Sequence, residues 1–106
     1  MNWEEAKQRT IAEWRRIRST IGRDDETRLL ADINAECDLC RKASDVAEDP
    51  SERCESCLGF QQFGGCHEAN LAMSELVMGK DLERLTVLVD DFIEKLESIE
   101  TSRSSP

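Results

Sequence analysis

Residues 82–99 read LERLTVLVDDFIEKLESI, and this stretch has the clearest periodicity of the chain. Its apolar side chains recur at alternating steps of three and four, which average about 3.5 residues and match the seam of a helical bundle. Leu88 and Ile93 widen this apolar face. The seam itself consists of Leu82, Leu85, Val89, Phe92, Leu96 and Ile99. The stretch therefore predicts a long amphipathic helix, with Asp81 as its N-cap.

The amino-terminal residues 3–21 predict a second helix of the same kind. Apolar or small side chains again recur at steps of three and four, which places them on one face. They are Trp3, Ala6, Thr10, Trp14, Ile17 and Ile21. Asn2 is a suitable N-cap, and Gly22 is a suitable end for this helix.

The middle of the chain predicts two more helices with an irregular segment between them. One begins at Asp24 or Asp25 and has an apolar side, and the other extends from near Gly65 to Gly79. Residues 48–65 show no sustained period, which is uncommon for a long connection unless it is functional or anchored. No stretch alternates apolar and polar residues as a strand does. We therefore expect an all-α fold, a small antiparallel four-helix bundle with a metal-anchored loop between helices 2 and 3.

Length and charge restrict the class of protein. The 106 residues fit one helical metal-binding domain over 1–100, followed by a disordered tail over 101–106. Fourteen Lys and Arg against 23 Asp and Glu give a net charge of −9, which disfavours contact with nucleic-acid phosphates. No stretch reaches the roughly 20 apolar residues that span a bilayer, and the first residues do not resemble a signal peptide. We expect a cytoplasmic protein, in which stable disulfides are rare.

Four of the five cysteines form two CxxC pairs that indicate a metal site. The pairs are Cys37–Cys40 and Cys54–Cys57, and thirteen residues separate them. Zinc in structural sites takes four donors at tetrahedral corners, and two such pairs complete that shell. The separation falls just short of the usual spacing of tetrathiolate zinc sites. The sequence predicts Zn²⁺ bound by all four, with the first pair on the apolar side of a helix and the second in the irregular segment.

The neighbouring residues leave the ligand set open. Cys66 is either a buried core thiol or, as a thiol at a helix amino terminus, a replacement for Cys54 or Cys57. His67 is the only histidine of the chain, and we interpret it as a surface or capping residue in preference to a ligand.

Residues that flank the cysteines allow two interpretations each. Arg41, Lys42 and Arg53 either offset the negative charge of a thiolate site or are ordinary surface residues. Phe60 and Phe63 either form a small core beneath the loop or also cover the metal.

The predicted function is that of a small non-enzymatic zinc-binding protein, an interaction or regulatory module with a structural tetrathiolate site. The sequence contains no Ser-His-Asp set, no phosphate-binding loop and no His-Glu-x-x-His motif. Two alternatives remain, because four cysteines also hold an iron–sulfur cluster and because a helical CxxC pair can act as a thiol-based redox switch. A metal-free bundle with buried thiols is a weaker alternative. A protein partner is expected, and binding of nucleic acid or membrane is not. The wide apolar face of the last helix fits either the core of a monomer or the contact of a homodimer.

Overall fold

The computed structural model describes residues 2–23, 25–35, 37–64 and 67–101. All regular structure in these ranges is helical, so the predicted all-α class is confirmed. The elements in chain order are α1 (Trp3–Thr20), α2 (Glu26–Asn34), α3 (Asp38–Val46), the 3₁₀ turn η1 (Pro50–Glu52), α4 (Leu58–Phe63), α5 (His67–Ser74), the π-helical η2 (Glu75–Gly79) and α6 (Leu82–Glu97).

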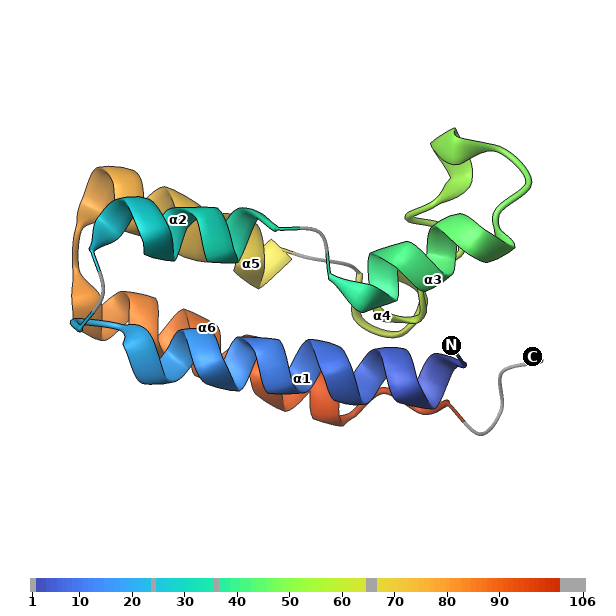
Figure 1. Cartoon of the computed structure of the whole chain (residues 1–106), viewed down its shortest axis with the longest axis horizontal. Helices are drawn as coiled ribbons and strands as arrows, with labels where there is room; N and C mark the ends of the chain where they lie inside the picture. The colour runs from blue at the N-terminus through green and yellow to red at the C-terminus, as the bar shows by residue number, and fades with distance from the viewer. Residues whose placement is uncertain (1, 24, 36, 65–66, 102–106) are drawn as a thin grey trace.

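The centre of the core lies between α1 and α6, which run side by side along the length of the molecule (Figure 1). Trp14 meets Phe92 edge to face, with ring centroids 4.7 Å apart. The predicted seam of the last helix is confirmed from Leu85 to Ile99, all of whose seam residues are buried. Leu82 is the exception, at 47% exposed, because it stands in the first turn of α6 at the outer end of the helix.

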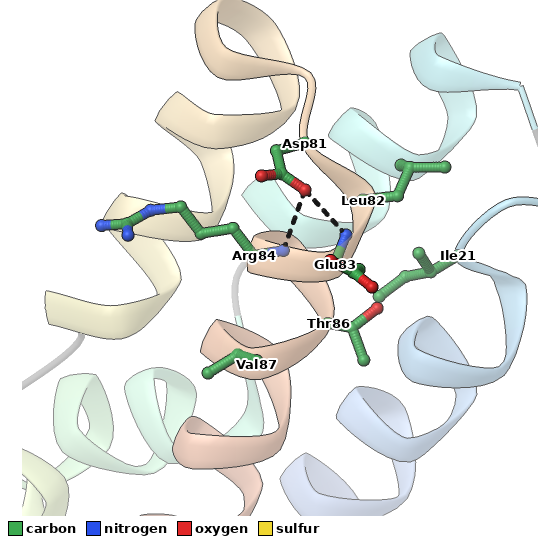
Figure 2. Close-up of a pocket in the computed structure, with 7 residues that line it drawn as sticks. All are labelled: Ile21, Asp81, Leu82, Glu83, Arg84, Thr86 and Val87. Carbon is green, nitrogen blue, oxygen red and sulfur yellow. Dashed lines mark hydrogen bonds between the residues drawn. The ribbon is translucent and has the colours of Figure 1, made fainter.

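Side-chain caps fix where the two long helices begin. The Asn2 side chain accepts a hydrogen bond of 2.7 Å from the amide of Glu5. The Asp81 carboxylate accepts hydrogen bonds of 3.1 and 3.3 Å from the amides of Glu83 and Arg84 (Figure 2). Both predicted N-caps are confirmed, and each satisfies amide groups that a helix start otherwise leaves without partners.

The predicted second helix is divided into α2 and α3, so the chain has more helices than the four expected. Asp25 caps α2 by accepting a hydrogen bond of 2.7 Å from the amide of Arg28. Ala35 and Cys37 have extended backbones, with ψ of 143° and 163°, and they end one helix and begin the next. The break lets α2 pack against both α1 and α5, while α3 packs against α1. Periodicity alone missed it, because apolar residues continue at helical spacing across the break.

The third predicted helix is a continuous helical segment that ends at Gly79, as expected. Its last turn is the π-helical η2, and Lys80 follows it in the left-handed region at φ 55°. Gly79 allows the Glu75 side chain to fold back on the turn, because a Cβ at this position would lie 1.8 Å from the Glu75 carboxylate. That carboxylate also pairs with Arg84 at 3.7 Å, which ties η2 to α6.

The start of α1 and the residues after α6 lie at the same end of the molecule (Figure 1). Lys7 donates a hydrogen bond of 2.9 Å to the carbonyl of Ile99, and the Thr101 hydroxyl donates to the Glu4 carboxylate. The rest of the predicted tail, residues 102–106, lies outside the described residues. None of the helices described is both long and apolar enough to cross a membrane.

Candidate metal centre

Both CxxC pairs lie at helix amino termini. Cys37 is the N-cap of α3, and Cys40 follows within the first turn of that helix. Cys57 is the N-cap of α4, and its amide donates a hydrogen bond of 3.1 Å to the carbonyl of Cys54. The positive end of the helix dipole at the two N-cap positions acts to lower the thiol pKa, against the effect of burial. The sequence predicted the first pair within a helix, and the structure places it at the start of one.

We call residues 37–64, which comprise α3, η1 and α4, the cysteine lobe. It occupies the right-hand end of Figure 1, and η1 projects away from the long helices. Within the lobe Cys57 is buried, Cys37 and Cys40 are half-buried, and Cys54 is exposed; none of the four is in a disulfide. The alternatives that involve Cys66 lie outside the described residues.

Two adjoining cavities bring the four predicted ligands into one region. The first, of about 410 Å³, is lined by Cys37, Cys40 and Cys54 and reaches the Trp14 and Phe92 rings. The second, of about 330 Å³, also has Cys40 and Cys54 in its wall. The residues that line only this second cavity are Cys57, Phe60, Gly64 and His67. Cys40 and Cys54 therefore stand between the two, with Cys37 on one side and Cys57 on the other.

The sulfur atoms influence one another electrostatically. Interaction with the Cys40 thiol, followed by burial, raises the pKa of Cys37 far above its ordinary value. Burial also raises the pKa of Cys57, and the charges of Cys37 and Cys54 add to this. Crowded thiols resist losing several protons at once, and a bound cation removes that resistance by stabilising every thiolate.

Backbone amides act in the opposite direction on both N-cap thiols. The amides of Leu39 and Cys40 lower the pKa of Cys37, and those of Gly59 and Phe60 lower the pKa of Cys57. N–H groups directed at a ligating sulfur are a usual outer shell of a thiolate site. The short helices of the lobe thus supply donors that a plain loop lacks.

The cationic residues near the cysteines separate into two groups. Arg41 pairs with Asp38 at 3.3 Å, and the Lys42 ammonium lies 5.9 Å from the centre of the Trp3 ring. These two behave as surface residues. Arg53 lines both cavities and is the basic residue whose position suits a negatively charged thiolate site.

The two phenylalanines of α4 differ in role, one extending the core and the other lying where it can cover a metal. Phe63 packs edge to face against Phe92 at 6.3 Å and extends the core. Phe60 is 43% exposed and lines the second cavity beside Cys57. Gln62 ties α4 to the carboxyl end of the chain, because its side chain exchanges two hydrogen bonds of 2.8 Å with the backbone of Glu100.

Sequence reasoning missed the residue that anchors the first pair. The Thr10 hydroxyl is buried, donates a hydrogen bond of 2.8 Å to the carbonyl of Ala6 and accepts one of 3.3 Å from the amide of Leu39. It thereby fixes the first turn of α3, between the two cysteines, to α1. The signal available was a hydroxyl residue on the apolar face of the first helix.

A larger cavity lies at the opposite end of the molecule, and its lining has fewer groups suited to a functional site. It measures about 770 Å³ and is lined by residues of α6 together with Ile21 (Figure 2). Two of its charged side chains already have structural roles, since Asp81 caps α6 and Arg84 pairs with Glu75. The cysteine lobe therefore remains the candidate site.

Within the part of the chain described, no three His, Cys, Asp or Glu side chains converge closely enough to hold a metal ion. The four sulfurs border the two cavities instead of meeting at one point, so the metal prediction rests on their chemistry and placement. No protein-family model, curated protein or solved structure matches the chain. The site is therefore interpreted from its own residues.

Proposed function

We propose that this is a small non-enzymatic zinc-binding protein of the cytoplasm, in which Cys37, Cys40, Cys54 and Cys57 hold one structural Zn²⁺. In this proposal α1, α2, α5 with η2, and α6 form an antiparallel four-helix core, and the metal holds the cysteine lobe against it. The observation that carries the proposal is the position of both CxxC pairs at helix amino termini around the same two cavities.

The chemistry of the donors suits zinc. Thiolates bind Zn²⁺ at about 2.3 Å in a tetrahedron, so the four side chains must turn inward from the walls of the two cavities to bind one ion. Cys40 and Cys54 border both cavities, and a cation between them is accessible to Cys37 from one side and Cys57 from the other. Arg53, in the wall of both cavities, offsets part of the negative charge of four thiolates around a divalent ion.

A closed shell of four thiolates assigns the metal a structural role. Such a shell leaves no coordination position for water or substrate, whereas catalytic zinc sites retain one. The expected consequence of binding is a fixed arrangement of α3 and α4, whose surface then serves contacts with a protein partner. Self-association remains part of the proposal, and sedimentation of the zinc-loaded protein at several concentrations tests it.

An iron–sulfur cluster is the second candidate, and the spread of the sulfurs favours it. The described thiols surround cavities of about 410 and 330 Å³ without converging on one point. A cluster contains several iron and sulfide ions, so it accepts cysteines that are farther apart than those around a single ion. Visible absorption of protein purified without oxygen distinguishes the two, because zinc thiolates are colourless.

The test is elemental analysis of the full chain purified anaerobically without added metal. We expect one zinc per chain, and we expect Cys57→Ser and Cys37→Ser to lose it. Cys66→Ser is the matched control, since it removes a thiol while leaving the proposed ligands intact. Metal loss in that control contradicts the ligand set. Iron with sulfide supports the second candidate, and a folded chain that contains neither zinc nor iron as purified overturns both.

A further inference from the structure

The two CxxC pairs differ in the surroundings of their sulfur atoms. In the first pair, the Cys37 and Cys40 thiols interact directly across the first turn of α3, and this interaction is the main influence on Cys37. In the second pair, Cys57 is buried next to Gly59, with its sulfur 3.7 Å from the position of a Cβ there, while Cys54 is exposed. The two thiols of the first pair therefore lie close enough to interact directly.

We propose that Cys37 and Cys40 are a redox-active dithiol, which hydrogen peroxide converts to a disulfide. Residues three positions apart on a helix have Cβ atoms about 5–6 Å apart, and a disulfide needs about 3.5–4.5 Å. The bond therefore forms with a local adjustment of the first turn of α3, where Cys37 is the N-cap and already outside the regular helix. Release of zinc by this reaction rests on the proposed function, whereas formation of the disulfide does not.

The cavities give peroxide a route to this pair. Cys40 lines both cavities, and Cys37 lines the first of them, so both thiols are reachable from their walls. Cys54 is more exposed, but its partner Cys57 is buried among the residues that begin α4. Access from the cavities and the direct interaction of the two thiols together favour the Cys37–Cys40 pair.

The reaction is balanced with peroxide as the sole oxidant. The Cys40 thiolate attacks one peroxide oxygen, the O–O bond breaks, and the leaving hydroxide takes a proton to become water. The Cys37 thiol then attacks the resulting sulfenic acid, an S–S bond forms, and a second water departs. Two thiols lose two electrons to one peroxide. A disulfide is no ligand for zinc, so two of the four proposed donors are lost and the ion leaves.

The structure also indicates what stays in place after oxidation. Phe63 remains against Phe92, and Gln62 keeps its paired hydrogen bonds to Glu100. Leu39 keeps its amide hydrogen bond to Thr10 between the two oxidised residues. We therefore expect the helical core to remain folded, while the segment around η1, which holds Cys54, detaches from the metal site.

The experiment treats the full-length protein as purified with hydrogen peroxide. It follows zinc with a chromogenic chelator, the intact mass, and disulfides by peptide mapping without reduction. We expect a mass loss of two hydrogens, a Cys37–Cys40 peptide as the main product, one zinc released per disulfide, and recovery with dithiothreitol and Zn²⁺. Cys66→Ser is the matched control and is expected to behave as the native chain, while Cys37→Ser is expected to form no disulfide within this pair.

The outcomes separate this inference from the proposed function. A Cys37–Cys40 disulfide in a chain that never held metal supports the dithiol and refutes the zinc site. A zinc-loaded chain whose main product is Cys54–Cys57, a bond to Cys66, or sulfonic acid without a disulfide refutes the dithiol and leaves the zinc site standing. Zinc release before any thiol is oxidised also overturns the proposed coupling.

Discussion

The helical core and the cysteine lobe are stabilised by different means. Along α1 and α6 the core buries a continuous set of large apolar side chains, and the Trp14–Phe92 pair lies within it. The lobe buries few side chains, among them Leu39 and Leu58, and leaves Val46 44% exposed. Burial of apolar area is the main driving force of folding, so the lobe gains less from it than the core does. The thiols gather in the part of the molecule that buries fewer large apolar side chains.

The comparison predicts that the largest loss of stability follows from a change in the core. Phe92→Ala removes a ring that contacts both Trp14 and Phe63, so it weakens the core and its junction with the lobe together. We expect the free energy of unfolding to fall by about 3–5 kcal/mol, measured by urea denaturation with circular dichroism.

Val87→Ala is the matched control for that change. It lies on the same helix but is 56% exposed, and we expect a change below about 0.5 kcal/mol. Equal losses in the two variants contradict the assignment of the core to the α1–α6 contact.

Removal of the proposed zinc sharpens the comparison, because we expect it to act on the lobe alone. Zinc that binds only the folded lobe stabilises it by about 2.7 kcal/mol when its free concentration is 100 times the dissociation constant. On chelation we expect amide exchange to accelerate in α3 and α4, while exchange in α1 and α6 stays slow. Hydrogen–deuterium exchange with mass spectrometry measures both, and zinc added back is the control. Uniform acceleration along the chain shows that core and lobe unfold as one unit.

The sequence predicted the core well and the lobe poorly, for a physical reason. A helix that buries one face along its whole length must repeat apolar residues at helical spacing. The patterns of residues 82–99 and 3–21 therefore show which face of each helix is buried. The helices of the lobe are short, begin at Cys37 and Cys57 instead of a usual capping residue, and depend on contacts with distant residues. Cys spacing identified the residues of the candidate site, but no local signal showed that α2 and α3 separate at Ala35.

Thr10 joins the two regions, and its substitution tests how strongly they are linked. Thr10→Val keeps the shape of the side chain but removes the acceptor for the Leu39 amide, which is then buried without a partner. The expected cost is about 1–3 kcal/mol in the free energy of unfolding, with faster amide exchange at the start of α3. Thr20→Val is the control, because among the described residues its hydroxyl bonds only within its own helix, to the carbonyl of Ile17. If Thr10→Val costs no more than the control, α3 is anchored by other contacts.

The smallest expected effect is electrostatic and concerns Glu68, where the chain returns from the lobe into α5. Burial raises the pKa of Glu68. The hydrogen bond and charge of Lys95, with a contribution from His67, lower the pKa by more than burial raises it, so it lies below the ordinary 4.5. A lowered folded pKa means that the ion pair contributes stability above pH 4.5 and loses it as the pH falls through the folded pKa.

Glu68→Gln removes that titration. We expect the difference in stability between the native chain and the variant to shrink between pH 7 and pH 3, measured by urea denaturation at each pH. The second carboxylate oxygen is buried and has no hydrogen-bond partner among the described residues, so part of the gain from Lys95 is offset by its desolvation. The difference at pH 7 is therefore expected to stay below about 1 kcal/mol. If the difference in stability stays constant from pH 7 to pH 3, Glu68 acts through packing and not through its charge. The start of α5 is then stabilised in the same way as the apolar core.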